Sequence, residues 1–267
     1  MNINLPGTRS AYGLQFALTV IKVYMPEGPS LVIIKEALLQ FKRKKILHAS
    51  GNAKIDMSLL ENKKITDIKT WGKHLLICCK DVAVRIHLMM WGSYRINERK
   101  ETQPRLSLQF ENGEINFYNT ATKLIEGDLN KIYDWSADVL SDEWDEKKTK
   151  KKLKAIPEKN ICDALLDQNI FAGVGNIIKN EVLFRICVHP ESVVGALPKK
   201  QLDELIKEAR NYSFDFLRWK KEYTLRKHWC IYTKKKCPRC NIPVKKKYLG
   251  ETKRRTFFCD NCQMKYL

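Results

Sequence analysis

A proline followed by a carboxylate could do covalent chemistry near the start of this chain. Pro26 and Glu27 stand between Met25 and Gly28. If Pro26 is the first residue of the functional chain, its nitrogen is a free secondary amine, a nucleophile with an acid/base beside it. If Pro26 stays joined to Met25, its nitrogen is a tertiary amide without nucleophilic chemistry. Glu27 could also be an ordinary carboxylate that a helix N-terminus stabilises.

Four cysteines near the end of the chain could bind a metal. They form two Cys-x-x-Cys pairs, Cys237 with Cys240 and Cys259 with Cys262, separated by 18 residues. Two residues between cysteines let both thiolates reach one tetrahedral Zn²⁺. The spacing therefore predicts a structural zinc ion. A redox dithiol is the alternative, and the presence of two paired motifs argues against it. The other five cysteines lack this spacing and are predicted to be core residues.

A glycine-rich turn lies between these two features. Residues 167–176 end in Gly173-Val174-Gly175-Asn176, and Asn176 fits the first position of a predicted helix. Free N–H groups at a helix N-terminus bind phosphate. Alone this signal is weak, because glycine-rich turns precede many helices that bind nothing.

The charge of the chain indicates a polyanionic partner. The 267 residues include 49 Lys and Arg against 30 Asp and Glu, a net charge of +19. This excess favours DNA, RNA or an anionic membrane surface, with a basic ribosomal-type protein as the alternative. We find neither an apolar run of membrane-spanning length nor a signal peptide, and expect a cytoplasmic, nucleoid-associated protein of bacterial type.

The hydrophobic pattern predicts the elements that must position these residues. Apolar residues at helical spacing predict a helix over 30–41. Short alternating runs predict antiparallel strands over 65–70, 74–79, 82–87, 93–96, 105–110 and 115–118. Further helices are predicted over 153–155, 160–166, 176–185 and 199–219, and a basic hairpin over 243–248 and 256–258. We expect the lysine run 147–152 to break the pattern and mark a domain boundary.

Five motifs together resemble one family. Met25-Pro-Glu-Gly-Pro29, Trp71-Gly-Lys73, His87-Leu-Met-Met-Trp-Gly92, the 167–176 turn and the cysteine pairs follow one another in the order typical of the formamidopyrimidine-DNA glycosylase/endonuclease VIII family. The resemblance covers about residues 25 to 267. It implies an α+β fold: an N-terminal antiparallel β-sandwich with a flanking helix, a helix–two-turn–helix domain and a C-terminal zinc-finger β-hairpin.

The resemblance also implies domain bounds. They are a catalytic β-sandwich domain over 25–146, a helix–two-turn–helix DNA-binding domain over 147–230 and the zinc-finger hairpin over 231–267. Residues 1–24 are then a leader, either a tail or a start-site artefact. We expect the functional chain to begin at Pro26, because a leader would place the proline nitrogen in a peptide bond.

The family's chemistry can be transferred to single residues of this sequence. Pro26 would attack the deoxyribose C1′ and form a Schiff base, from which β- or β,δ-elimination cuts the strand. Glu27 would supply general acid/base catalysis. Lys73 would hold phosphate near the scissile sugar. One departure is Ser30, where the family usually has a glutamate.

The resemblance implies DNA contacts as well. Asn176 and Arg254 would grip phosphates around the flipped nucleotide, and Arg255 could share this task. Met89, Met90 and Trp91 would be a wedge that fills the space left in the base stack. As the alternative, the two methionines are ordinary core residues. The partner would be double-stranded DNA with a damaged base or an abasic site, bound by a monomer.

The expected activity is that of a bifunctional DNA glycosylase/AP lyase. Residues 117–125 lack the arginine loop of the purine-directed branch, and the wedge is contiguous, so oxidised pyrimidines are favoured over 8-oxoguanine or formamidopyrimidines. A non-catalytic DNA- or RNA-binding protein on the same scaffold is the main alternative. A ribosome-associated or nuclease-type zinc-ribbon protein is a third.

Overall fold

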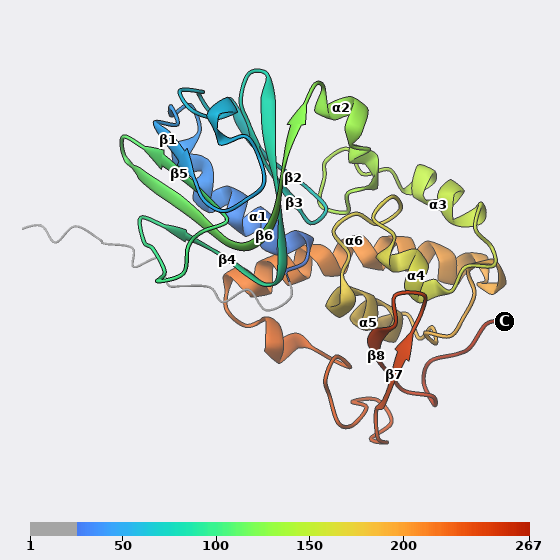
Figure 1. The fold of residues 1–267 in the computed structure, drawn as a ribbon. Helices are drawn as coiled ribbons and strands as arrows, with labels where there is room; N and C mark the ends of the chain where they lie inside the picture. Colours follow the sequence, from blue (N-terminus) through green and yellow to red (C-terminus); the bar gives the residue numbers. More distant parts are fainter. Residues whose placement is uncertain (1–25) are drawn as a thin grey trace, which may run out of the picture.

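The computed structural model describes residues 26–267, so the expected leader 1–24 lies outside the described range (Figure 1). The N-terminal part combines helix α1 (Gly28–Leu38) with a six-stranded antiparallel sheet in the order β1-β5-β6-β4-β3-β2. The strands are β1 (His48–Ser50), β2 (Asp67–Trp71), β3 (His74–Cys78), β4 (Val82–Ile96), β5 (Leu106–Phe110) and β6 (Gly113–Glu126).

Two long strands connect the halves of this sheet. The first half of β4 pairs with β3 and the end of β6, while its second half pairs with the start of β6, which also pairs with β5. Apolar residues of both halves and of α1 share one buried core, for example Ile34, Ile77 and Phe117. The expected sandwich-like packing around an α-helix is therefore present, within a single continuous sheet.

Three strand predictions need correction. The runs 82–87 and 93–96 belong to the single strand β4, because the chain continues in an extended form through the register shift between Leu88 and Ser93. The run 115–118 is only the first part of β6, which continues as a strand through mostly polar residues to Glu126. The short edge strand β1 was not predicted. The Asn112-Gly113 hairpin is confirmed, with Gly113 at φ 141°.

The middle of the chain is helical. Its helices are α2 (Leu129–Ile132), α3 (Glu146–Lys154), α4 (Ile161–Leu166), α5 (Asn176–Arg185) and α6 (Lys199–Lys221). Single 3-10 turns are η1 (Leu39–Phe41), η2 (Met57–Leu59), η3 (Trp135–Ala137), η4 (Val194–Ala196) and η5 (Leu225–His228). The predictions for α4, α5 and α6 are confirmed.

The lysine run 147–152 was wrongly expected to break the pattern. It forms most of α3, because Asp145 accepts hydrogen bonds from the backbone N–H groups of Lys147 and Lys148 and so caps the helix. Thr149 and Leu153 face the core while the lysines point outward. Lysine has a good intrinsic helix propensity, so a charged run with two inward residues is a normal surface helix.

The C-terminal hairpin consists of β7 (Lys245–Leu249) and β8 (Arg254–Phe258), as predicted. Its inner residue Phe257 and the cysteines Cys237 and Cys259 belong to the same buried core as α5 and α6. The hairpin is thus packed onto the helices rather than attached as a separate unit.

Helix α6 joins the two parts of the molecule. In Figure 1 it runs from the helical part back to the sheet, and its C-terminal half contacts α1. Lys221 near its end forms an ion pair with Glu36 of α1 at 2.7 Å. Among the described residues, no helix is both long enough and apolar enough to cross a membrane.

Candidate active site

Glu27 is buried where the sheet part meets the helical part, with 2% of its surface exposed. Its Oε1 accepts a hydrogen bond from the N–H of Ile177 at 2.7 Å, and its Oε2 accepts one from the N–H of Ile178 at 3.2 Å. These N–H groups belong to the first turn of α5, where the helix dipole favours an anion. The turn that we expected to bind phosphate therefore holds the Glu27 carboxylate with these two groups.

Glycines allow this close approach. A Cβ at Gly175 would stand 2.3 Å from Cδ of Glu27, and one at Gly28 would stand 2.7 Å from Cα of Gly173. The N–H of Gly28 donates to the carbonyl of Gly173 at 2.9 Å. Gly72, at φ 53°, lies against the same backbone, 3.0 Å from the N of Gly173 by the same measure. The Pro-Glu-Gly-Pro and Gly-Val-Gly-Asn segments and the Trp71-Gly72 turn thus meet at one point.

Lys73 lies on the turn between β2 and β3 and interacts electrostatically with Glu27. Burial lowers the pKa of Lys73 and raises the pKa of Glu27, and each charge opposes the shift of the other. Arg254 is close enough to lower the pKa of Lys73 further. Burial raises the pKa of Asp138, which accepts a hydrogen bond from the N–H of Gly72 at 2.8 Å, to about 6. Asp138 thereby fixes the turn that presents Lys73.

Pro26 is half-buried and directly precedes Glu27, which is the N-cap residue of α1. The buried Ser30 donates its backbone N–H to the carbonyl of Glu27 at 2.8 Å. Position 30, where the family usually has a glutamate, therefore contributes to the first turn of α1.

Lys220, on the last turn of α6, is a residue of this site that the sequence did not reveal. Burial lowers the pKa of Lys220, while the charge of Glu27 raises it. Glu27 is therefore within the electrostatic range of two lysines, Lys73 from the sheet and Lys220 from α6. No sequence motif marks Lys220, because only the packing of α6 against α1 brings it to Glu27.

The three other predicted polar residues lie together beside this site. The side-chain amide of Asn176 donates to the carbonyl of Arg255 at 2.8 Å, which joins α5 to β8. The side chains of Arg254 and Arg255 are exposed at the start of β8. The structure thus brings Asn176, Arg254 and Arg255 next to each other, with Arg254 in electrostatic reach of Lys73.

Met89, Met90 and Trp91 project from the sheet. They are 46%, 62% and 63% exposed and lie where β4 and β6 shift register. Trp91 has a left-handed φ of 72°, and the side chain of Asn119 donates to the carbonyl of Met90 at 2.6 Å. The alternative that the methionines are core residues is therefore wrong. Three apolar side chains are instead held outward on a fixed backbone.

The four cysteines form a cluster that could bind a metal. The sulfur atoms of Cys237, Cys240, Cys259 and Cys262 all lie within 4.8 Å of one another, and those of Cys237 and Cys262 are 3.7 Å apart. Tetrahedral zinc with Zn–S bonds of about 2.3 Å requires S–S distances of about 3.8 Å. The side chain of Asn261 donates to the sulfur of Cys240 at 3.2 Å. The donor set and its geometry fit a thiophilic ion.

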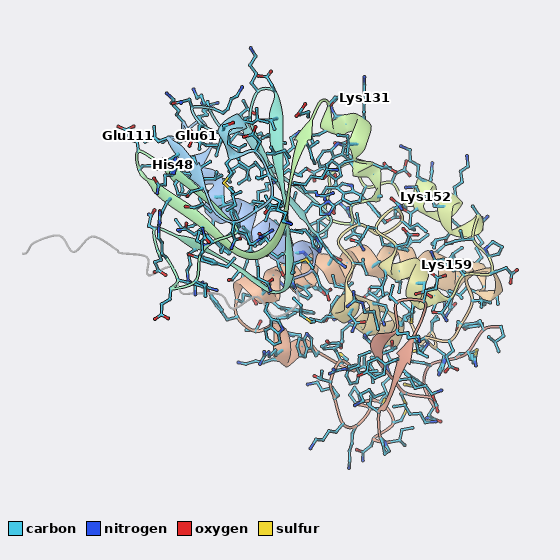
Figure 2. All side chains as sticks on the ribbon, in the orientation of Figure 1. His48, Glu61, Glu111, Lys131, Lys152 and Lys159 are labelled. Atoms are coloured by element: carbon cyan, nitrogen blue, oxygen red, sulfur yellow. The ribbon has the colours of Figure 1, made fainter. Side chains whose placement is uncertain are left out.

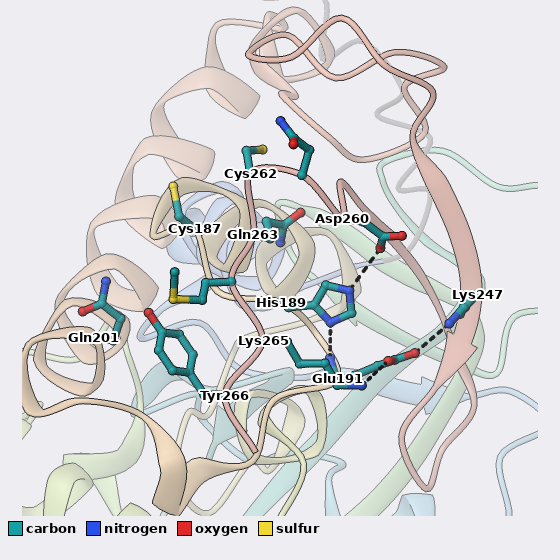
Figure 3. A pocket seen from close by; sticks show the side chains of 12 residues that line it. Cys187, His189, Glu191, Gln201, Lys247, Asp260, Cys262, Gln263, Lys265 and Tyr266 are labelled. Atoms are coloured by element: carbon teal, nitrogen blue, oxygen red, sulfur yellow. Dashed lines mark hydrogen bonds and ion pairs between the residues drawn. The ribbon is translucent and has the colours of Figure 1, made fainter.

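A cavity of about 650 Å³ lies beside this cluster, and Figure 3 shows its lining. Its polar groups pair with one another: Glu191 binds Lys247 and Lys265 at 2.8 and 2.9 Å, and His189 lies 3.3 Å from Asp260. These lysines hold the pKa of Glu191 at about 2. The pairs connect the hairpin and the C-terminal residues to the loop after α5, so this cavity is part of the support of the hairpin.

Other charged groups lie away from the site. Figure 2 shows His48 and Glu61 at the edge of the sheet, where they form an exposed pair at 2.7 Å. Lys152 and Lys159, on the side of α3 and α4, pair with Asp134 and Asp167. These charges contribute to the overall field and have no link to Glu27.

Two buried acids that the sequence did not reveal also support the hairpin. Glu181 of α5 accepts hydrogen bonds from the N–H groups of Cys230, Ile231 and Tyr232 at 2.8 to 3.0 Å. Asp163 of α4 accepts from the N–H of Glu251 in the hairpin turn at 3.0 Å. Both acids fall within predicted helices and have apolar neighbours in the sequence, and this was the only sign in the sequence that they are buried.

Comparison with known proteins agrees with this geometry. Residues 25–124 match the formamidopyrimidine-DNA glycosylase N-terminal domain, and residues 136–213 match the formamidopyrimidine-DNA glycosylase H2TH domain. The chain is 30% identical over 234 residues to the formamidopyrimidine-DNA glycosylase of Mycoplasma genitalium, with 76% of this chain and 80% of the relative covered.

Vertebrate proteins are similar as well. The chain is 33% identical over 205 residues to endonuclease 8-like 3 of Mus musculus. This match covers 73% of this chain and 34% of the relative. The chain spans only about a third of the length of the first vertebrate relatives that it matches.

A solved structure shares the fold. The formamidopyrimidine-DNA glycosylase of Lactococcus lactis, non-covalently bound to DNA with an abasic site, superposes with a TM-score of 0.78 at 23% identity, over 90% of this chain and all of that one. Together with the two family domains, these matches confirm the resemblance that the motifs indicate. The chain belongs to the formamidopyrimidine-DNA glycosylase/endonuclease VIII family.

Proposed function

We propose that this protein is a bifunctional DNA glycosylase/AP lyase of base excision repair. The observation that best supports this is the binding of the Glu27 carboxylate to the first turn of α5, 150 residues away in sequence. This contact joins Glu27, and the adjacent Pro26, to the helix that begins with Asn176, which supports an acid/base role for Glu27 and a DNA-binding role for the neighbouring residues. The positive charge of the chain, +19, suits a DNA partner.

In the proposed reaction Pro26 is the nucleophile, as a free N-terminal amine. Its nitrogen attacks C1′ of the deoxyribose, the bond from C1′ to the damaged base breaks, and the base leaves with the proton that the amine gives up. The bond from C1′ to the ring oxygen then breaks, Glu27 gives a proton to that oxygen, and the nitrogen and C1′ are joined as an iminium. The resulting iminium acidifies the C2′–H, which permits loss of the 3′ phosphate and then of the 5′ phosphate. β- and β,δ-elimination are both compatible with these groups.

Glu27 is proposed as the general acid/base at the sugar ring oxygen. Burial raises its pKa, so it retains a proton more readily than an exposed glutamate would. Lys73 is proposed to hold the phosphate next to the reacting sugar. Burial lowers the pKa of Lys73, and Glu27 opposes this shift and so favours its charged form.

The exposed residues beside this site are proposed to bind the duplex. Asn176 and Arg254, with Arg255, would contact phosphates around the flipped nucleotide. Met89, Met90 and Trp91 would enter the base stack as the wedge, and their exposure on a fixed backbone supports this. One copy of the chain supplies all these groups, so we expect a monomer to act.

The four-cysteine cluster is proposed to hold a structural Zn²⁺. Its ligands would be Cys237, Cys240, Cys259 and Cys262, and the metal would stabilise the hairpin that presents Arg254. We propose the functional division 25–146, 147–230 and 231–267, with the last two sharing one core.

Oxidised pyrimidines are the proposed substrates. Residues 117–125 continue β6 through Asn119, which has a left-handed φ of 50°, and no arginine occurs among them, so this stretch lacks the arginine loop of the purine-directed branch. The name of the mouse relative, endonuclease 8-like 3, favours the same branch. The name of the M. genitalium relative favours the purine-directed branch as the second candidate. Relatives from both bacteria and vertebrates match the chain, so we do not propose the nucleoid-associated, bacterial-type location that the sequence led us to expect.

Borohydride trapping tests the catalytic role. A form that begins at Met25, with the methionine removed, should form a covalent adduct with a duplex that contains an abasic site. The form with residues 1–25 attached should form none, because its Pro26 nitrogen is an amide. Mass spectrometry of the N-terminal peptide identifies the first residue in each form. If the Met25 form binds this duplex but gives no adduct, the protein is a non-catalytic DNA-binding member of the family.

A further inference from the structure

Lys179 is a fully buried lysine that the proposed reaction does not use. It lies on α5, is 0% exposed, and burial lowers its pKa. A buried ammonium group is costly unless it is hydrogen-bonded and compensated by nearby groups. A lysine at this position therefore needs an explanation from its contacts.

The ammonium group of Lys179 begins a hydrogen-bonded chain toward Arg254. Its Nζ donates to Oγ1 of Thr256 at 2.8 Å. The same hydroxyl donates its proton to the carbonyl of Arg254 at 3.0 Å. Because a hydroxyl is one donor and an acceptor, the lysine directs the Thr256 proton to the arginine backbone.

Thr256 is the residue at which β8 enters the core. Thr256, Phe257 and Phe258 are buried, while Arg254 and Arg255 before them are exposed. The side chains of Asn176 and Asn180 hold the carbonyl of Arg255 and the N–H of Phe257 at 2.8 and 2.6 Å. Among the described residues 26–267, the hydrogen bonds from Lys179 through Thr256 are the ones that link α5 to Arg254 itself.

We propose that Lys179, acting through the Thr256 hydroxyl, is a positioning residue that fixes the backbone of Arg254 for contact with a DNA phosphate. This inference rests on the phosphate-binding role proposed for Arg254. It adds that the same helix whose first turn binds Glu27 also sets the position of the arginine, so that one element aligns the carboxylate and the phosphate contact.

The test is binding to a duplex that contains a tetrahydrofuran abasic-site analogue, measured by fluorescence anisotropy over a series of salt concentrations. Thr256→Val keeps the shape of the side chain but removes the hydroxyl, and Lys179→Met keeps its length but removes the ammonium. Each should weaken binding about tenfold, as for loss of a hydrogen bond to a charged group. Each should also flatten the salt dependence, which is the effect expected of Arg254→Ala.

Three controls separate positioning from a general loss of structure. Thr256→Ser retains the hydroxyl and should bind like the unaltered protein. Ser213→Ala removes another fully buried hydroxyl, which bonds only within α6, and should leave binding unchanged. Thr256→Val and Lys179→Met should bind zinc as the unaltered protein does, because the cysteines and the other α5 contacts remain.

A double-substitution cycle decides the matter. If positioning is correct, adding Thr256→Val to Arg254→Ala has no further effect on affinity. A further loss in that background, or an unchanged salt slope in Thr256→Val, overturns the positioning role while the role of Arg254 stands. If Arg254→Ala alone changes neither affinity nor slope, the phosphate-binding role is wrong and the positioning role with it.

Discussion

The Glu27 carboxylate rests directly on the backbone of Gly175. A Cβ at position 175 would stand 2.3 Å from Cδ and 2.6 Å from Oε1 of Glu27, which is less than any real contact distance. The two hydrogen bonds from α5 to Glu27 depend on this approach. The absence of a side chain at Gly175 is thus a requirement of the site itself.

Gly175→Ala should therefore displace Glu27 and impair catalysis. The backbone of Gly175, at φ −121°, is accessible to alanine, so the contact and not the conformation is the cause. A displacement of about 1 Å can reduce a rate about 100-fold, and we expect a loss of that order in strand cleavage at abasic sites. The matched control is Gly127→Ala, at φ 90° with open space around it, which should lower stability slightly and leave cleavage intact. Equal cleavage by the two variants would contradict the contact with Glu27.

Lys220→Gln should move the pH dependence of cleavage. Lys220 lowers the pKa of Glu27, so its removal should raise that pKa and shift the corresponding limb of the kcat/KM profile to higher pH. The height of the profile should change little, because Lys220 is not proposed to touch the DNA. Lys221→Gln is the control, since Lys221 pairs with Glu36 at 2.7 Å instead. A profile that stays in place in Lys220→Gln would show that Lys220 does not act on Glu27.

The N-terminal part should lose stability in acid through His74. Burial lowers the pKa of His74 from 6.5 to about 4, assisted by the positive charges of Arg85, His87 and Lys73. The unfolded chain therefore binds a proton that the folded chain does not, and the free energy of unfolding falls as the pH decreases from 6.5 toward 4. Denaturant unfolding at several pH values measures this fall. His74→Phe should reduce it, and an identical pH slope in the variant would assign the acid sensitivity to other groups.

Removal of the proposed zinc ion should loosen the helical part more than the sheet. The cysteines Cys237 and Cys259 share a core with α5 and α6, whereas α1 and the sheet have a separate one. After chelation we expect lower hydrogen-exchange protection over 237–266 and α5, unchanged protection in β3 and β4, and loss of DNA binding. Zinc content is followed by mass spectrometry. Retained protection of the hairpin in the metal-free protein would contradict a structural role.

The sequence reveals those features that depend on local spacing. The two Cys-x-x-Cys pairs predict the cluster because two intervening residues suffice to bring thiolates together. The turn at Asn112-Gly113 and the helices α5 and α6 follow from glycine conformation and apolar periodicity. The approach of Glu27 to the 167–176 turn could be expected only through the family resemblance.

Features that depend on packing could not be predicted in this way. Lys179 and Lys220 are ordinary lysines in sequence and acquire a role only because β8 and α1 pack against their helices. The lysine run of α3 was misjudged because charge was weighed above helix propensity. β4 was divided at the exposed Met89–Trp91 segment because its outward apolar residues interrupt the alternation expected of a strand.

The contact of Gly28 with Gly173 has a consequence for how the two parts of the molecule can move. Their backbones meet at a hydrogen bond of 2.9 Å, and Gly72 lies close to the backbone of Gly173 as well. A junction built from main chain has no alternative rotamers, so it cannot yield by gradual repacking of side chains. Separation of the two parts at this point would require the loss of that hydrogen bond and of the close contact between the two backbones.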